Sequence, residues 1–203
     1  MGSGCFPDKK TKEKKMKRQT RRTLLFIARA AVIAALYAVL TMVLWSTSSG
    51  IIQFRLSEAL CVLPAFTTAA IPGLTIGCAL ANLIAGHPLD AVFGSLATLI
   101  AAVFSWMIGR MFGVGKTERL KLGAELLVPL PPVLFNAAII PFVLYYAYEY
   151  TTIEDFGITS KFAVLGFYAR TVGAGEAAVC YLLGIPLMIA CNRIHRKTDL
   201  FKD

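Results

Sequence analysis

Histidines and paired cysteines are scarce in this chain of 203 residues. Its two histidines, His87 and His195, are too few and too far apart in the sequence for a histidine-based metal cluster. The five cysteines, none of them in CxxC spacing, are Cys5, Cys61, Cys78, Cys180 and Cys191. We interpret the four that lie in or at apolar segments as small packing residues. The sequence therefore predicts neither a disulfide framework nor a metal site.

Catalytic motifs are also missing. The run 113–117 resembles the end of a phosphate-binding loop, but the motif needs glycine at position 110, where the chain has arginine, and no strand precedes it. Ser95 has no histidine placed to activate it. No histidine or aspartate in a recognisable metal arrangement accompanies the carboxylates Glu58, Asp90 and Glu176. We therefore expect a protein that is not an enzyme and has no cofactor.

Apolar residues are abundant. They make up 57% of the sequence, and the mean hydropathy of +0.65 lies well above that of soluble domains. A spanning helix needs about 20 apolar residues, so residues 23–192 have room for six short transmembrane helices. The chain has too little polar mass for a separate soluble module. We predict an all-α polytopic membrane domain over 23–192, with a cytoplasmic tail over 193–203.

Turn-forming residues separate the six predicted helices. Pro72-Gly73 and Gly86-His87-Pro88 mark two of the boundaries. The second and third helices are short, roughly 21–24 Å from the 1.5 Å rise per residue, and could instead form a tilted or re-entrant pair. Several prolines are expected to bend the fifth helix. We predict helices over about 23–45, 56–71, 73–85, 89–112, 125–150 and 162–192.

Positive charge is concentrated at the start of the chain, where residues 1–22 hold nine Lys/Arg and two acidic residues. The charged region is too long for a signal peptide, and the apolar stretch behind it has spanning length. This basic head could attract anionic lipid or nucleic acid. We prefer a mostly disordered tail that holds the N-terminus in the cytoplasm, and we expect no nucleic-acid partner.

Loop charges indicate the orientation in the membrane. With six spans and the N-terminus inside, the basic 110–122 loop and the C-terminal tail also lie in the cytoplasm. The acidic 149–155 loop then lies outside. Every short loop rich in Lys/Arg falls on one side, as the positive-inside rule requires, whereas an odd number of helices would break this agreement.

Few polar side chains are predicted inside the membrane. A charge at a helix centre costs roughly 2.5–3.5 kcal/mol, so Glu176, in the middle of the sixth helix, is a functional candidate. Arg170 lies six residues earlier, on a different face of that helix. Asn136 follows prolines that free backbone carbonyls to face a cavity. Asn82, in the third helix, is more easily explained by an interhelical hydrogen bond.

Arg55 and Glu58 lie three residues apart at the outer end of the second helix. A plain ion pair at the membrane interface would explain them without any function. A role in ligand binding is about equally compatible with their position, so both interpretations stay open.

Small residues line the first helix at a spacing of four. Because residues four apart share a helix face, they form a smooth stripe that lets another helix approach closely. That helix could belong to this chain or to a partner, and composition alone favours the chain itself. The stripe consists of Ala30, Ala31, Ala34, Ala35 and Ala38.

Several runs in the same order resemble the QueT family. They are Gln53–Pro64, Ala70–Asn82, Phe93–Leu99, Leu130–Ala137 and Gly175–Ala177. The resemblance covers roughly residues 24–192 and leaves out the basic head. It implies a six-helix substrate-binding (S) component of a bacterial energy-coupling factor (ECF) importer for queuosine precursors. It also implies a transmembrane T subunit, two cytoplasmic ATPases, and the alanine stripe as the surface for the T subunit.

For a deazaguanine ligand, one carboxylate can accept both the ring N–H and the exocyclic amine, a role for Glu176 or Glu58. An aminomethyl group on the base would want a second carboxylate, and amides could serve the carbonyl face. The expected substrate-binding residues are Arg55, Glu58, Asn82, Asn136, Arg170 and Glu176. Stacking surfaces are offered by Phe54, Tyr145, Tyr146, Phe167 and Tyr168, although interface or core packing explains these aromatics better.

Two alternative functions remain open. The scaffold could bind another small vitamin-like molecule, because fold does not determine function. A solitary secondary transporter could use Glu176 as a proton relay. A purely structural membrane protein is disfavoured by the cost of burying Glu176 and Asn136.

Overall fold

Helices make up nearly all of the chain that the structure describes. The computed structural model describes residues 9–43, 54–116, 119–149, 152–153 and 157–198. Over these ranges there is no β-sheet, and Ile153 and Ile158 form an isolated bridge. The predicted all-α class is confirmed. The elements are α1 (Lys9–Val43), the 3₁₀ helix η1 (Leu56–Ala65), α3 (Ala70–Ile84), α4 (Pro88–Phe112), α5 (Leu122–Leu127), α6 (Leu130–Tyr146), α7 (Lys161–Leu182) and α8 (Gly184–Lys197).

In the described part of the chain, four helical segments are long and apolar enough to cross a membrane. They are Glu13–Val43, Pro88–Phe112, Leu122–Tyr146 and Lys161–Lys197. The predicted second and third helices correspond to η1 and α3, which are apolar but shorter. A 3₁₀ helix rises about 2.0 Å per residue, so the ten residues of η1 cover roughly 20 Å. Spanning length is thus confirmed for four of the six predicted helices.

Proline positions explain where the observed helices differ from the predicted ones. Pro72, predicted to stop the second helix, lies inside the first turn of α3, where the missing N–H is not needed. The fifth predicted helix divides into α5 and α6 at Val128, because Pro132 has no N–H to donate to the Val128 carbonyl. The sixth divides at Leu183 for the same reason, since Pro186 cannot donate to Leu182.

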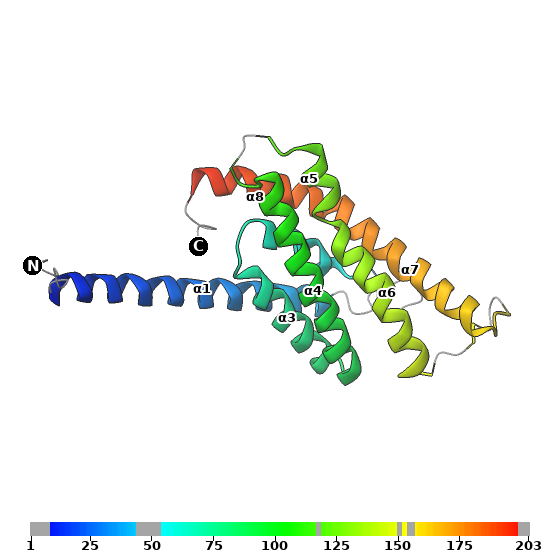
Figure 1. Ribbon diagram of the computed structural model, residues 1–203. Helices are drawn as coiled ribbons and strands as arrows, with labels where there is room; N and C mark the ends of the chain where they lie inside the picture. The colour runs from blue at the N-terminus through cyan, green and yellow to red at the C-terminus, as the bar shows by residue number, and fades with distance from the viewer. Residues whose placement is uncertain (1–8, 44–53, 117–118, 150–151, 154–156, 199–203) are drawn as a thin grey trace, which may run out of the picture.

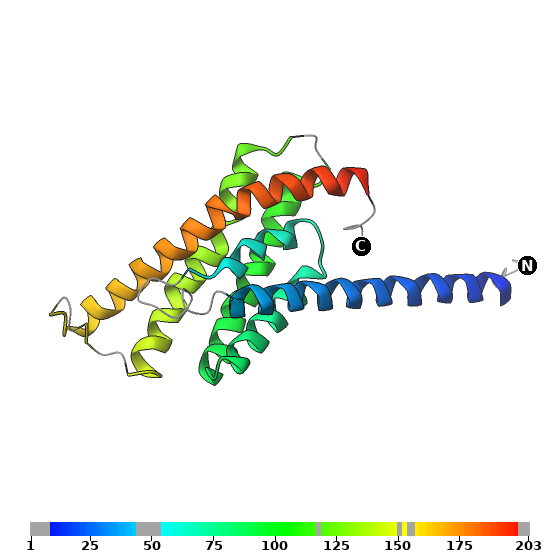
Figure 2. The ribbon, with the colours of Figure 1, turned by 180° about the vertical axis from the view of Figure 1, so that it is seen from behind.

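The basic head is helical from Lys9 onward, where the sequence analysis expects a mostly disordered tail. Residues 9–22 contain neither glycine nor proline and are rich in lysine and arginine, which are good helix formers. Glu13 and Lys17, four residues apart, form an exposed ion pair at 2.7 Å. The head and the apolar part of α1 therefore form one continuous helix. Its N-terminal part projects away from the other helices in both views, whereas its C-terminal part packs against α3 (Figures 1 and 2).

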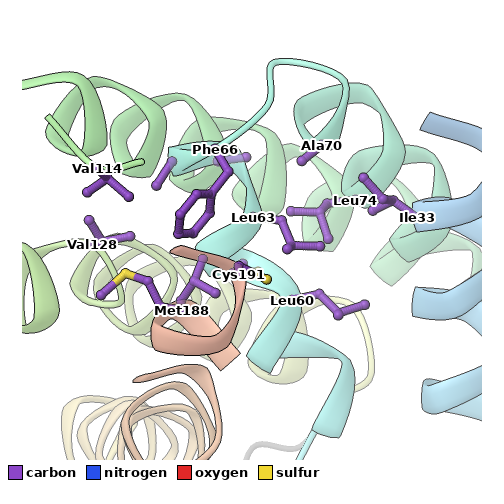
Figure 3. Packing of buried hydrophobic residues seen from close by; sticks show 14 of the residues in the cluster. Ile33, Leu60, Leu63, Phe66, Ala70, Leu74, Val114, Val128, Met188 and Cys191 are labelled. Atoms are coloured by element: carbon purple, nitrogen blue, oxygen red, sulfur yellow. The ribbon is translucent and has the colours of Figure 1, made fainter. Parts of the chain in front are cut away.

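Helix η1 lies at the centre of the molecule, against α1, α3, α4, α7 and α8 (Figure 1). Every residue from Ser57 to Ala65 is buried, which suits a helix covered on all sides. The main apolar core surrounds it, with Leu60 and Leu63 of η1 facing Leu74, Met188 and their neighbours (Figure 3).

Helices α1 and α3 approach each other closely through small residues. A Cβ atom added to Gly73 would lie 2.8 Å from the Ala30 carbonyl oxygen. One added to Gly77 would lie 2.8 Å from the Ala34 carbonyl oxygen. The two pairs, each spaced by four residues, form a close backbone contact of the kind that packs helices in membranes.

Candidate functional site

Buried polar side chains converge beside the start of η1. They come from α1, α3, α4, α6 and α7 as well as from η1 itself, so segments far apart in the sequence build one site. In the described residues, no three side chains of His, Cys, Asp or Glu are placed to hold a metal ion. We call the group the polar cluster; its members are Tyr37, Arg55, Glu58, Cys61, Cys78, Asn82, Asp90, Asn136, Glu176 and Cys180, each at most 7% exposed.

Glu58 has both carboxylate oxygens engaged by this chain. The Tyr37 hydroxyl donates to Oε1, and the Cys61 thiol lies 2.8 Å from Oε2. The ion pair between Glu58 and Arg55 that the sequence allowed is not formed. Instead, the Arg55 carbonyl accepts the Glu58 backbone N–H at 2.9 Å, in the first turn of η1. Glu58 is therefore a hydrogen-bonded part of the scaffold.

Glu176 is buried just as deeply, at 2% exposed, but it is only partly satisfied. The Asn136 side-chain amide donates to Oε1 at 2.9 Å, which joins α6 to α7. The Cys180 thiol lies 4.0 Å from Oε2, too far for a strong hydrogen bond, and 3.7 Å from the Glu58 carbonyl oxygen. Among the described residues, Oε2 thus keeps acceptor capacity for another donor.

Arg55 is the one cationic side chain among the buried described residues. Its guanidinium interacts electrostatically with Asp90 and Glu176. No carboxylate of the described residues lies within ion-pair distance of it. The Arg55 guanidinium therefore lies near the carboxyl groups of Asp90 and Glu176 without forming a direct salt bridge to either.

Asn82 joins α3 to α4 at the edge of the polar cluster. Its amide nitrogen donates to the Cys78 carbonyl at 3.0 Å and to the Asp90 carbonyl at 3.3 Å. The second bond is the interhelical contact that the sequence analysis favours for Asn82. It holds the first turn of α4, where Asp90 lies, against α3.

Comparison with known proteins identifies a family. The family described as QueT transporter matches residues 27–193, most of the chain and all of the polar cluster. This chain belongs to the QueT transporter family. The resemblance found in the sequence is confirmed, and a member of a transporter family is not an enzyme.

One relative of known description is the queuosine precursor transporter QueT of Lactococcus lactis subsp. cremoris (strain MG1363). It is 41% identical over 76 residues, which cover 36% of this chain and 45% of the relative. The match thus spans less than half of that protein's length. No solved structure matches the chain.

Arg170 does not join the polar cluster of this QueT-family chain. It lies on α7, six residues before Glu176, and its side chain is exposed. Six residues correspond to about one and two-thirds turns, so the two side chains leave the helix on different faces. Of the six residues expected to bind substrate, the other five lie in the cluster.

Four of the five aromatic residues considered for stacking lie elsewhere. Tyr145, Phe167 and Tyr168 pack in a second apolar cluster between α6 and α7. Tyr146 is 58% exposed and lies beneath the Lys161 ammonium, 5.0 Å from the ring centroid. These positions agree with packing and interface roles. Phe54 adjoins Arg55 and is 42% exposed.

Sequence reasoning missed Tyr37 and assigned Cys61 and Cys180 to packing alone. All three contact the carboxylates. A signal was present, because Cys61 follows Glu58 by three residues and Cys180 follows Glu176 by four, spacings that put side chains on one helix face. Tyr37 lies within the alanine-rich part of the first helix, and its sequence position gives no indication that it contacts Glu58.

The alanine stripe of α1 is divided between two surfaces. Ala30 and Ala34 are buried against α3, so this chain already covers them. Ala38 is half-buried, and Ala31 and Ala35 are exposed. Of the five alanines, only Ala31 and Ala35 are therefore exposed on the surface of α1.

Proposed function

We propose that this chain is the substrate-binding S component of an ECF-type importer and that its substrate is a queuosine precursor, a deazaguanine base. The polar cluster is the observation that carries the proposal, in particular the buried Glu176 with acceptor capacity on Oε2. The description of the Lactococcus relative as a queuosine precursor transporter supports the choice of substrate.

A deazaguanine base presents two adjacent donors, a ring N–H and an exocyclic amine. A carboxylate accepts such a pair with both oxygens. Each hydrogen bond to a charged group contributes about 1.5–3 kcal/mol. Glu176 is the better acceptor, because Oε1 uses one lone pair for Asn136 and Oε2 is open. Glu58 would first have to release Tyr37 or Cys61.

Asn136 orients Glu176 in this proposal. A free carboxylate on a helix can adopt several rotamers, and fixing one of them in advance lowers the entropic cost of binding. The 2.9 Å bond from the Asn136 amide holds Glu176 in one orientation. Asn82 supports the site indirectly in this proposal, because its side-chain amide joins α3 to α4.

The proposed importer needs partners for energy and for movement through the membrane. The sequence carries no complete phosphate-binding loop, so we assign ATP hydrolysis to separate cytoplasmic subunits. Exposed small residues on α1, Ala31 and Ala35, support a contact with the helix of a T subunit, because small residues let helix backbones approach in lipid.

Replacing Glu176 and Glu58 singly with glutamine tests the site. In purified protein, Glu176→Gln should weaken binding of an aminomethyl-deazaguanine by about 10- to 100-fold in calorimetry. Its melting temperature should change little, because glutamine can still accept the Asn136 hydrogen bond. Glu58→Gln should mainly lower the melting temperature, because its partners Tyr37 and Cys61 belong to this chain. Folded Glu176→Gln protein that binds like wild type would refute the carboxylate assignment.

The importer architecture has its own test. The chain reconstituted alone in proteoliposomes should bind the base without accumulating it, and accumulation should require the T subunit, the ATPases and ATP. Uptake by the chain alone, driven by a proton gradient, would instead establish a secondary transporter.

A further inference from the structure

Asp90 is a buried carboxylate that the proposed function leaves without a role. It lies in the first turn of α4 and is 7% exposed. Its Oδ1 atom is buried and has no hydrogen-bond partner among the described residues. A buried carboxylate oxygen without a partner costs free energy, so its retention calls for an explanation.

The side of α4 that carries Asp90 faces the interior at the polar cluster. Asp90, Gly94 and Thr98 follow each other at a spacing of four, which puts them on one helix face, and all three are buried. A Cβ atom added to Gly94 would lie 3.6 Å from the Asn82 amide nitrogen and 3.9 Å from Cδ1 of Ile140. This face therefore points toward α3 and α6, which carry Asn82 and Asn136.

Carboxyl groups outnumber cationic side chains in the polar cluster. The buried carboxylates Glu58, Asp90 and Glu176 accompany a single buried cation, Arg55, in the described part of the chain. Asp90 interacts electrostatically with Arg55 and with the half-buried His87, and it forms no ion pair with Arg55. Because a buried ionised carboxylate is costly unless it is paired, this excess of carboxyl groups favours a ligand that brings a positive charge.

The start of α4 is also a favourable place for an acidic side chain. The unpaired N–H groups in the first turn of a helix carry partial positive charge, and an acidic side chain there is stabilised. The Asn82 side-chain amide donates to the Asp90 backbone carbonyl at 3.3 Å, and this hydrogen bond holds the first turn of α4 in place. A carboxyl group held at this position is a suitable partner for an ammonium group, whose positive charge would stabilise the carboxylate form.

We propose that Asp90 binds a primary ammonium group of the ligand and so selects a deazaguanine carrying an aminomethyl group over one carrying a neutral substituent. This inference rests on the proposed function. Glu176 accepts the donors of the base, and Asp90 accepts one N–H of the ammonium. The two carboxylates thus recognise different parts of one molecule.

The test is calorimetric titration of the purified full chain with two bases, aminomethyl-deazaguanine and the same base with a nitrile. Wild type should bind the aminomethyl base more tightly by about 10- to 100-fold, the effect of one charged hydrogen bond. Asp90→Asn keeps the shape and removes the charge. It should weaken aminomethyl binding by that factor and change nitrile binding by less than about threefold.

The matched control is Ser95→Ala, on the same helix, where the hydroxyl donates to the Val92 carbonyl at 3.1 Å. It should leave the affinity for both bases unchanged. A thermal melt without ligand provides a second measurement. Because Asp90→Asn removes a buried carboxyl group whose Oδ1 has no partner among the described residues, its melting temperature should equal or exceed that of wild type.

The outcomes separate the two proposals. If wild type binds both bases and Asp90→Asn loses affinity for them equally, or melts well below wild type, Asp90 is structural and this inference is wrong while the proposed function stands. If folded wild type binds neither base, the proposed substrate is wrong, and the inference fails with it.

Discussion

The contact between α1 and α3 predicts a large effect for a single methyl group. In Gly77→Ala, the added Cβ would lie 2.8 Å from the Ala34 carbonyl oxygen and 2.8 Å from Cβ of Tyr37. Neither atom is the end of a flexible side chain. The two helices must therefore separate by some tenths of an ångström to admit the methyl group.

The magnitude follows from packing. Overfilling a well-packed contact costs about 1–3 kcal/mol, whereas alanine gains about 0.5–1 kcal/mol over glycine inside a helix. We expect a net loss of stability. For a protein of this size, about 2–4 °C of melting temperature corresponds to 1 kcal/mol. Displacing Tyr37 also disturbs its hydrogen bond to Glu58, so ligand affinity should fall as well.

A melting curve in detergent, with and without aminomethyl-deazaguanine, measures both effects. Gly166→Ala is the matched control, because a Cβ atom at Gly166 of α7 would have nothing within 4 Å. That variant should melt at or above the wild-type temperature. If Gly77→Ala and Gly166→Ala melt alike, α1 and α3 do not approach as closely as described, and the reasoning fails.

Two further substitutions test the polar cluster. Tyr37→Phe removes the hydroxyl that donates to Glu58 and leaves a buried acceptor unpaired, so we expect a loss of about 1–3 kcal/mol in the free energy of unfolding; an unchanged melting temperature would contradict this hydrogen bond. Arg170→Gln should leave the affinity for the base within about threefold of wild type in calorimetry, because a substitution at an exposed side chain away from the cluster has little effect. A larger loss of affinity would show that Arg170 contributes to binding.

Hydropathy predicted the helical segments well because each long apolar run must satisfy its backbone hydrogen bonds internally. The predicted fourth helix, 89–112, differs from α4 by one residue at its start. Proline was the weaker guide. Its presence signals a boundary, but a new helix can begin just before it, as at Pro72 and Pro186, and a helix can also continue through it, as α6 does at Pro141.

The spacing of small residues contained more information than the sequence analysis drew from it. Ala30 and Ala34 on one helix match Gly73 and Gly77 on another at the same spacing of four. Composition alone could not say whether such a stripe contacts its own chain or a partner, because both contacts use the same packing. The structure assigns one edge of the stripe to α3 and leaves Ala31 and Ala35 exposed.

At the polar cluster, the free-energy cost of burying a carboxyl group has to be distinguished from the role of that group. The insertion penalty identifies Glu176, in the middle of a predicted helix, as a polar group that needs a reason to be buried, and it leaves the role of Glu58, at a helix end, open. It cannot tell which of them is already satisfied, because the partners come from distant segments: Tyr37 is 21 residues from Glu58, and Asn136 is 40 residues from Glu176. Once the donors are assigned, the two carboxylates separate. Glu58 has both oxygens engaged and stabilises the fold, whereas Glu176, oriented by Asn136, keeps an oxygen open for a ligand.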